Sequence, residues 1–490
     1  MLRGALLVGL SVALAACSSS PAKDPKGGSG SKSGAANREK VGLTIYNGNF
    51  GLVREIRTVD LPGSENGGKA TLDFGDVSAH LQPASVVIRS LDDADSLDIL
   101  EQNYRYDLLT PFALMEKYVG KDVKVIRWNA KLGHDEEHDA KLLSVQGGTV
   151  VDIGGEITPN YQGRMAFPGV PENLIAKPTL TWLLTSKAPK QKVEVTYLSD
   201  ALNWKADYVL QVDKDDKLAD LHGWVTLTNE TGTSYQDAEL QLVAGDVQRV
   251  RQELYRMRRD EDYEFKAIEQ EPQFNEESLF EYHLYSLNRT TDVLDKESKQ
   301  VTLLEASGIQ VKKKLILNGS ADYYRTSYYE PIERNAKVGV YLDILNEEDN
   351  QLGMPLPMGT VRVYKHDRSG SLQFIGEDAI DHTPKDEKIR VKMGDAFDVV
   401  ADRKQTYWDT LSTGRDGGDC GSESEFEIEL RNHKDVAEDV ELVEPASGEW
   451  EIVKSSHPAK KKDSKTFTFD VNVPANGKTK VTYRVRIEWC

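Results

Sequence analysis

The sequence contains little cysteine and no long hydrophobic run. Its three cysteines are Cys17, Cys420 and Cys490, and the two besides Cys17 cannot by themselves form a zinc ribbon or an iron–sulfur centre. The longest apolar stretch, residues 5–16, is shorter than the roughly 20 residues that a membrane-spanning helix needs. A G-x-S-x-G nucleophile elbow, a phosphate-binding loop and a dinucleotide fingerprint are also missing. We therefore expect no catalytic residue, metal ligand or cofactor from these signatures.

Positive charge is also scarce relative to negative charge. The 61 Lys and Arg residues face 80 Asp and Glu residues, for a net charge of −19. An acidic balance of this size argues against nucleic acid as a partner and against adsorption to anionic lipid headgroups. The 490 residues leave room for about three domains of ~150 residues each.

The amino-terminal residues predict where the protein resides. Arg3 precedes the apolar stretch, which ends in Leu14-Ala15-Ala16-Cys17. This pattern resembles the bacterial lipoprotein signal, in which the peptide is cut before the cysteine and Cys17 is acylated. Several acyl chains anchor a protein stably, whereas one binds only marginally. The alternative is an ordinary secretory signal with an incidental cysteine.

A short tether follows the expected lipid anchor. Residues 18–39 are rich in Gly, Ser, Pro and Lys, a composition typical of a flexible coil. Ser18 stands where an Asp tends to retain lipoproteins at the inner membrane of enteric bacteria. We therefore expect a cell-envelope protein, held at the outer membrane by its lipid.

Beyond the tether the chain has the pattern of a mainly β, multidomain protein. Short alternations of apolar and polar residues recur between Gly-Gly, Asn-Gly and Pro-Gly steps, which is typical of β-sandwich and barrel modules. One helix is predicted between an N-terminal cap at Thr110 and an exit at Gly120, with Phe112, Met115 and Val119 on one face. The short strands predicted at 122–128, 140–146 and 149–153 suggest a small barrel within residues 105–170.

Composition divides the chain into five expected parts. The last one is predicted to be an immunoglobulin-like domain of few helices, because Val481, Tyr483, Val485, Ile487 and Trp489 alternate with polar residues. The parts are a signal peptide (1–16), a lipidated tether (17–40), an N-terminal β-rich domain (41–186), a central β-sandwich (187–411) with a charged excursion at about 250–281, and the C-terminal domain (412–490).

The ends of this last domain predict a disulfide between Cys420 and Cys490. A strand at 424–431 opens the domain and a strand at 481–489 closes it. If the two pair antiparallel, the cysteines meet within the roughly 7 Å between Cα atoms that a bridge requires. Export to an oxidising compartment permits the bond. Two free thiols, or a bridge between molecules through Cys490, are the alternatives.

Two charged motifs raise the question of a metal. His134-Asp-Glu-Glu-His138 matches the H-x-x-E-H peptidase motif, but that chemistry needs a helix with an apolar face and a third ligand. We expect a charged hairpin tip between strands ending near Trp128 and beginning near Ala140. Asp213-Lys-Asp-Asp216 lacks the Gly and Glu of a calcium-binding loop, so we expect a solvated turn.

Four tyrosines form the one candidate site for ligand stacking. Exposed tyrosine pairs can stack on sugar rings, and packing against a β-sandwich core is the alternative, which we favour. By the same argument Trp204, Trp224, Trp450 and Trp489 are expected in the core. The stacking candidates are Tyr323, Tyr324, Tyr328 and Tyr329.

Several long segments resemble one known family. They are WKADYVLQVD (204–213), GWVTLTNETGTSYQDAELQLVAGDV (223–247), FEYHLYSLNRTT (280–291) and PLPMGTVRVYKHDRSGSLQFIGEDAIDHTPKDE (355–387). They are similar to the bacterial domain of unknown function 4139, some members of which are called mucoidy inhibitors. The resemblance covers about residues 190–490, and NYRYDLLTP with the following helix looks like lipoprotein members. The resemblance implies a β-rich exported protein and supplies no activity or catalytic residues.

Together these features favour a non-catalytic lipoprotein that binds or scaffolds. The expected partners are the membrane, through the lipid anchor, and an envelope protein or glycan. The alternative is an envelope hydrolase, metal-dependent or carboxylate-based. Clustering of His134 and His138 with a third ligand would distinguish the two, because a metal-dependent site requires it.

Overall fold

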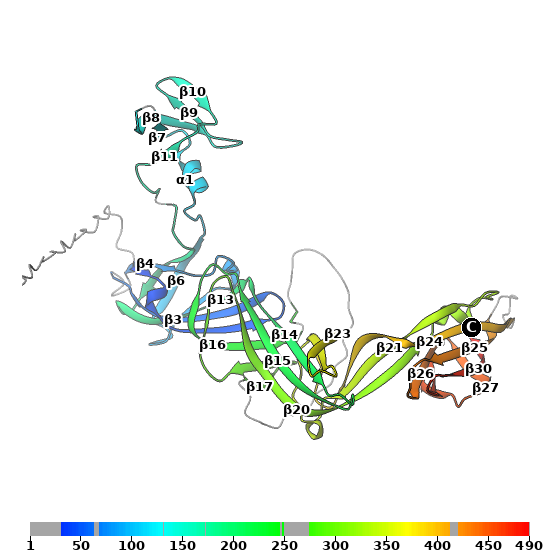
Figure 1. Ribbon diagram of the computed structural model, residues 1–490. Helices are drawn as coiled ribbons and strands as arrows, with labels where there is room; N and C mark the ends of the chain where they lie inside the picture. The colour runs from blue at the N-terminus through cyan, green and yellow to red at the C-terminus, as the bar shows by residue number, and fades with distance from the viewer. Residues whose placement is uncertain are drawn as a thin grey trace, which may run out of the picture.

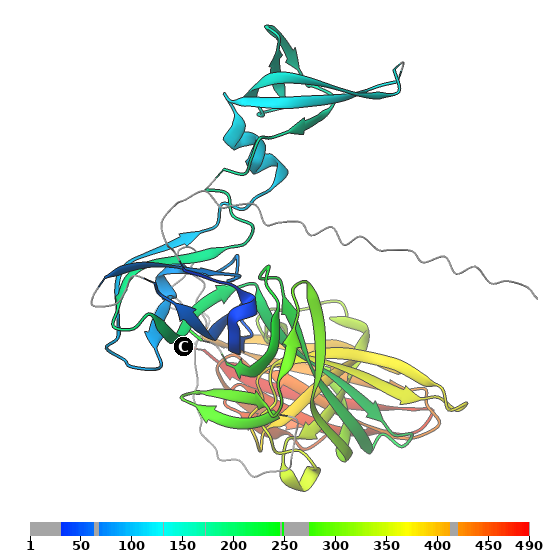
Figure 2. The same cartoon turned by 90° about the vertical axis from the view of Figure 1, so that its left-hand side faces the viewer.

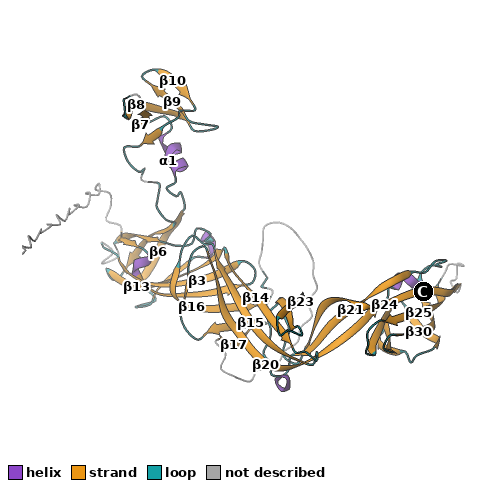
Figure 3. Ribbon diagram, viewed as in Figure 1, coloured by secondary structure: helices purple, strands orange, loops and turns teal. Residues whose placement is uncertain are grey.

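The protein is mainly β, with its strands arranged in several sheets, as predicted (Figures 1 and 3). The computed structural model describes residues 31–62, 68–130, 132–171, 173–245, 247–248, 274–411 and 420–489. Within these ranges the single α-helix is α1 (Pro111–Tyr118), and short 3₁₀ turns make up the other helical residues. No helix in the described part is long and apolar enough to cross a membrane. Cys17 and the tether up to residue 30 lie outside the described residues.

Two sheets contain the strands of residues 31–105. A four-stranded sheet has the order β1 (Ser31–Ser33), β4 (Lys69–Gly75), β12 (Thr179–Ser186) and β6 (Leu97–Arg105). An eight-stranded sheet has the order β17 (Phe274–Leu279), β18 (Tyr282–Leu287), β16 (Tyr235–Ala244), β2 (Arg38–Tyr46), β3 (Phe50–Asp60), β13 (Lys190–Asp200) and β5 (Val87–Ser90), with β19 (Thr291–Val293) beside β16.

The amino-terminal strands and the central strands share one hydrophobic core. Strand β2 lies between β3 and β16, and it is parallel to β16 with Leu43 opposite Leu240. Alternate residues of β2 are buried because one face of the strand covers the core. A single buried cluster runs from Val41 to Val391. The predicted boundary at 186/187 therefore does not separate two cores.

A thirteen-stranded sheet continues the body into the C-terminal sandwich. Its order is β23 (Leu372–Ile380), β22 (Gly359–His366), β14 (Leu202–Val212), β15 (Leu218–Asn229), β20 (Glu297–Asn318), β21 (Glu333–Leu345), β24 (Lys388–Leu411), β25 (Gly421–Asn432), β30 (Gly477–Glu488) and β27 (Glu449–Ser455). Strands β26 (Glu438–Pro445), β29 (Thr466–Val473) and β28 (Lys460–Asp463) form its second layer, joined to it by the parallel pairing of β26 with β20.

Three long strands take part in two cores. On β20, Ile309 lies in the large core and Leu317 in the C-terminal core; on β24, Val391 and Ala401 divide in the same way. The sandwich predicted for 412–490 therefore needs strands from before residue 412. Strands β24 and β25 pair antiparallel with Leu411 opposite Gly421, so the polar break lies between two paired strands and not between two domains.

The charged excursion is shorter than expected at its carboxyl end. Residues 274–279, predicted to be part of it, form β17 and pair antiparallel with β18. The rest of it, residues 250–273, lies outside the described residues.

Residues 106–176 form a separate inserted module that projects from the body (Figures 1 and 2). The predicted helix is confirmed: Thr110 Oγ1 accepts a hydrogen bond from Ala113 N at 3.0 Å, and Gly120 leaves the helix at φ +80°. The sheet has β10 and β11 at its two edges, and these do not pair with each other within the described residues, so the predicted barrel is not closed by hydrogen bonds. Its order is β10 (Glu156–Pro159), β9 (Val150–Ile153), β8 (His134–Ser144), β7 (Asp122–Asn129) and β11 (Arg164–Ala166).

Two buried asparagines fix equivalent turns in the two large cores. Asn229 Nδ2 donates to the carbonyls of Thr233 and Val293 at 2.9 and 3.1 Å. Asn432 Nδ2 donates to the carbonyls of Val436 and Val473 at 2.8 and 3.3 Å. Each asparagine is the last residue of one strand. Its side chain donates to the carbonyl four residues ahead and to the carbonyl of the last residue of a second strand. No repeat in the sequence predicts this internal repetition.

A buried ionic cluster holds the amino-terminal strands in place. The Glu55 carboxylate contacts Arg57 Nη2 at 2.5 Å and Arg38 Nε at 2.8 Å, and Tyr197 donates its hydroxyl to the same carboxylate at 3.1 Å. The Arg57 guanidinium also lies 3.6 Å from the centre of the Phe74 ring. Burial by itself raises the pKa of Glu55, but the two guanidinium groups outweigh it, so this pKa lies below its ordinary value.

We predict that Glu55→Gln weakens folding and reduces its dependence on pH. Removing the charge leaves two buried guanidinium groups without their partner, which costs about 3–5 kcal/mol at neutral pH. A carboxyl with a lowered pKa stabilises the fold above its unfolded pKa, and this contribution is lost as the pH falls through the folded value. Urea unfolding at neutral and acidic pH measures both effects. Glu101→Gln, at an exposed carboxylate of β6, is the control and should change neither quantity.

The strand register places Cys420 beside the last residues of the chain. Strands β25 and β30 pair antiparallel with Gly421 opposite Glu488, and Trp489 N donates to the Cys420 carbonyl at 2.9 Å. Cys420 is buried. Cys490 lies outside the described residues, so the disulfide stays a prediction that this register supports.

We predict that peptide mapping under non-reducing conditions finds Cys420 joined to Cys490. The bridge closes a loop of about 70 residues, so Cys490→Ser should lower the free energy of unfolding by up to about 4 kcal/mol. Recovery of both cysteines as alkylated thiols from protein exported to the envelope would contradict the prediction.

Candidate functional site

The histidine motif lies on a strand and not at a hairpin tip. His134 begins β8, opposite Asn129 of β7, and His138 lies opposite Val125, so the predicted loop was wrong from residue 134 onward. Pairing with β7 satisfies the backbone of this charged segment without an apolar face. Four residues along a strand span about 13 Å at ~3.3 Å per residue, too far for one metal ion. No three potential metal ligands gather anywhere in the described ranges.

The acidic segment after β14 is a turn, as predicted. The Asp213 carboxylate accepts hydrogen bonds from the backbone N–H groups of Lys217 and Leu218 at 2.8 and 3.2 Å. Asp216 forms an ion pair with Lys313 at 3.1 Å. These carboxylates therefore stabilise the β14–β15 connection.

The tyrosine cluster divides between core and surface. Tyr324 is buried, lies 5.2 Å from the Phe426 ring centre and donates its hydroxyl to Glu444 at 2.9 Å, so it is not available for stacking on a ligand. Tyr323 and Tyr328 are half-buried and contact each other edge to face. Tyr329 is 98% exposed. The four side chains do not form one stacking surface, because a 3₁₀ turn (Ala321–Tyr324) directs Tyr324 inward.

The tryptophans are only partly in the core. Trp204 is buried, as expected. The prediction that Trp224 lies in the core is wrong. Its neighbour Gly223 faces the core, and Trp224 lies half-buried on the opposite face of β15. Trp450 is half-buried at the edge of the C-terminal core, and Trp489 is 43% exposed.

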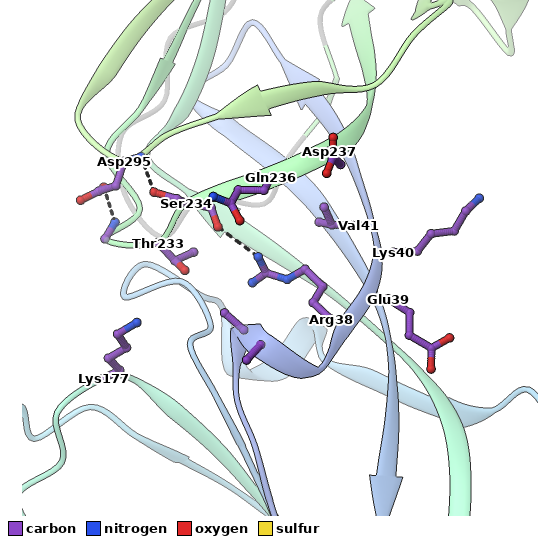
Figure 4. Close-up of a pocket in the computed structure, with 13 residues that line it drawn as sticks. Arg38, Glu39, Lys40, Val41, Lys177, Thr233, Ser234, Gln236, Asp237 and Asp295 are labelled. Carbon is purple, nitrogen blue, oxygen red and sulfur yellow. Dashed lines mark hydrogen bonds between the residues drawn. The ribbon is translucent and has the colours of Figure 1, made fainter. Parts of the chain in front are cut away.

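One cavity of about 540 Å³ lies between residues 35–41, at the start of β2, and the turn after β15 (Figure 4). Arg38 crosses it and donates to the Ser234 carbonyl at 3.0 Å. Lys177 forms an ion pair with Asp76, and the Asp295 carboxylate accepts from Gly232 N at 2.8 Å. These ionic groups are already paired with groups of neighbouring segments. We therefore assign this cavity a structural role, in which its polar side chains connect those segments.

A second cavity of about 540 Å³ lies in the inserted module and is mostly apolar. It opens between helix α1 and the edge strand β11, and we call it the α1–β11 cleft. Helix α1 contributes Leu114 and Met115, and β11 contributes Met165. The full lining is Leu109, Thr110, Pro111, Leu114, Met115, Thr149, Tyr161, Gly163, Met165, Phe167 and Val170.

One polar atom in this cleft is buried without a partner. The Tyr161 hydroxyl has no hydrogen bond to the described residues and is shielded from solvent. Glycine at position 163 allows this placement, because a Cβ atom there would lie 2.5 Å from the Tyr161 ring. The Thr110 hydroxyl already caps α1. Because its hydroxyl is shielded from solvent, Tyr161 lines the cleft with its ring and does not present a donor to a ligand there.

Large apolar side chains are exposed around the cleft and across the module. Phe112 of α1 is 53% exposed, and Val170 at the rim is 57% exposed. Of the three residues predicted to share one face of the helix, Phe112, Met115 and Val119, only Met115 packs in the core, together with Leu114 and Tyr118. Contiguous exposed apolar patches of several hundred Å² mark interaction sites, whereas single exposed apolar side chains are common on protein surfaces. The exposed residues are Tyr106, Leu109, Phe112, Val119, Trp128, Leu132, Ile157 and Val170.

The lining of the cleft carries no charged side chain among its described residues. Its described lining consists of aliphatic, aromatic, hydroxyl and glycine residues, which resembles the composition of small-molecule sites of 300–1,000 Å³. No pattern in the sequence predicts this cleft, because residues 109–115 and 161–170 meet only after the intervening strands have folded.

Comparison with known proteins gives a family and no activity. The family described as "Domain of unknown function (DUF4139)" matches residues 193–490. No curated protein matches the chain. The match begins inside β13, so β2, β3 and the inserted module precede it, although β2 and β3 complete the eight-stranded sheet. The α1–β11 cleft therefore lies outside the matched region.

Proposed function

The chain belongs to the DUF4139 family, and we propose that it is a non-catalytic binding lipoprotein of the bacterial cell envelope, tethered through Cys17. The observation that carries the proposal is the α1–β11 cleft with the exposed apolar residues around it. Of the two ligand classes expected from the sequence, an apolar lining favours a partner with apolar groups over a glycan, whose hydroxyls need polar partners. The family region and the strands β2 and β3 then serve as the frame.

The hydrolase alternative receives no support from the geometry. A metal-dependent site needs His134 and His138 on one metal ion, and their separation along β8 opposes it. The α1–β11 cleft presents no Asp, Glu, His, Lys or Cys among its described lining residues to act as a base or thiol nucleophile.

We predict that Cys17→Ala moves the protein from the membrane fraction to the soluble fraction. No other segment of the sequence is long and apolar enough to span a bilayer, so membrane attachment depends on the acylated cysteine. Cell fractionation followed by immunoblotting measures the change. A variant that stays with the membrane after a high-salt wash would contradict the anchor.

We predict that ligand binding protects the cleft from hydrogen exchange. Detergent-solubilised envelope extract should slow amide exchange in residues 109–118 and 161–170 of the full chain, measured by mass spectrometry. Met115→Trp fills the cleft and should abolish that protection, whereas Met358→Trp, at an exposed methionine of the body, should preserve it. Protection elsewhere, equal in both variants, would contradict a binding site in the cleft.

A further inference from the structure

We propose that the free edge of the C-terminal sandwich at residues 460–465 binds an anionic polysaccharide through its lysines. These residues read Lys-Lys-Lys-Asp-Ser-Lys, and we call them the lysine edge. The sandwich that carries them, with β27 and β30, lies at the end of the described molecule away from the inserted module (Figure 1). The site is therefore separate from the α1–β11 cleft and goes beyond the function proposed for it.

Strand β28 places these lysines along an open edge. It pairs with β29 and with no other strand of the described ranges. Lys460 lies opposite Thr468, and the next lysine lies opposite the core residue Phe467. Because successive side chains of a strand point to opposite faces, lysines flank the free edge on both sides. All six residues of the lysine edge are exposed.

Most of the positive charge of the lysine edge is available to a partner. Lys461, Lys462 and Lys465 form no ion pair with the described residues. The Asp463 carboxylate accepts a hydrogen bond from the Lys465 backbone N–H at 2.7 Å, so it is directed to the turn. The net charge of −19 acts weakly here, because physiological salt screens charges farther away than about 8 Å. The lysine edge therefore presents local positive charge on an acidic protein.

The charge of the edge selects against a second copy of the same strand. An unpaired strand edge can pair with another chain, and lysines on it oppose this pairing. Two lysine edges side by side would place like charges opposite each other, which is destabilising. A polymer that carries negative charge is attracted to the same place. The partner that fits is therefore an anion and not another copy of β28.

The surroundings of the edge favour a polysaccharide over a membrane or a nucleic acid. Residues 456–465 contain no Val, Ile, Leu, Met, Phe, Tyr or Trp that could enter a lipid surface. Sites for single-stranded nucleic acid stack bases on aromatic rings. The Trp450 ring beside the edge is half-buried and lies 5.4 Å from the Lys461 ammonium. Its indole N–H donates to the Ser464 carbonyl at 2.9 Å, so this ring serves the fold.

Lysine itself suits the spaced charges of a polysaccharide. The lysine edge contains no arginine, the residue that recognises a carboxylate or phosphate through two parallel hydrogen bonds. A lysine ammonium is a point charge on a flexible chain. It can therefore follow carboxylates or phosphates that repeat along a flexible sugar polymer without a fixed geometry.

The test is binding of a fluorescent galacturonic acid oligomer to the full chain carrying Cys17→Ala, measured by fluorescence anisotropy. Lys461→Gln, Lys462→Gln and Lys465→Gln combined should weaken binding about tenfold, because each exposed ion pair changes an equilibrium about two- to threefold. Lys461→Arg, Lys462→Arg and Lys465→Arg combined should retain binding. Added salt should weaken it, and a neutral maltose oligomer of equal length should not bind.

A matched variant separates the lysine edge from the charge of the whole chain. Lys69→Gln, Lys190→Gln and Lys214→Gln combined remove the same charge from exposed lysines elsewhere, and they should leave the affinity unchanged. Circular dichroism and size-exclusion chromatography show whether the glutamine variant of the lysine edge stays folded and free of aggregates.

A further variant tests the edge without removing a lysine. Asp470 forms an ion pair with Lys460. Glu441, which also acts on Lys460, pairs with Lys314 at 3.4 Å. Asp470→Asn frees the Lys460 ammonium and should strengthen binding about two- to threefold. Asp98→Asn, at an exposed carboxylate of β6, is its control and should have no effect. Lysines that only protect the edge from aggregation would not produce this gain.

The outcomes decide between the polysaccharide and its rivals. Salt-sensitive binding that the glutamine variant loses, the arginine variant keeps and Asp470→Asn strengthens supports the proposal. Absence of binding, or equal weakening by the control variant at positions 69, 190 and 214, overturns it. Tighter binding of an oligonucleotide of equal charge, or of phosphatidylglycerol vesicles, also overturns it. None of these results depends on protection of the α1–β11 cleft, so the proposed function is tested separately.

Discussion

Strands β20, β21 and β24 impose the constraint on which the rest of the structure depends. Each contributes side chains to the large core at one end and to the C-terminal core at the other. The backbone hydrogen bonds of the thirteen-stranded sheet therefore run without a break from one core to the other. Because loss of one core would leave half of each long strand without its packing, we expect the two sandwiches to depend on each other for stability.

Buried arginines strengthen both ends of this frame. Arg57 and Arg38 surround Glu55 in the large core, and Arg403 contacts Glu444 at 2.8 Å in the C-terminal core, with Tyr324 donating to the same carboxylate. Replacing a buried pair with apolar residues is often neutral, whereas breaking one is costly. Loss of one partner would therefore leave a buried charge without compensation in either core. In the large core, Arg57 donates to the carbonyls of Ser33 in β1 and Gly75 in β4. Arg38 of β2 joins the same cluster through Glu55.

The inserted module contributes differently. It has its own small core, it projects from the body (Figure 2), and it exposes large apolar side chains near its cleft. A module outside the main cores can change its surface without disturbing the long strands. This separation explains why the α1–β11 cleft lies outside the family region while the family region supplies the scaffold.

The sequence by itself determined the local features. Alternation of Phe426, Ile428 and Leu430 and of Val481, Tyr483 and Val485 predicted their strands, because one face of each is buried and the other is solvated. Thr110 and Gly120 predicted the limits of α1 through their backbone preferences. The turn at Asp213 followed from its polar residues. Each of these features depends on neighbours in the chain.

Only the tertiary structure decided which segments belong together. Periodicity shows that β2 and β20 have a buried face, but it does not show that β2 pairs with β16 or that β20 serves two cores, because such pairings join residues far apart in sequence. The same reason hid the cleft: Met115, Tyr161 and Met165 are ordinary residues in the sequence, and their site exists only where α1 meets β11. His134 and His138 show the converse case. Their motif can bind a metal ion when it lies on a helix, but on strand β8 the rise per residue separates the two side chains.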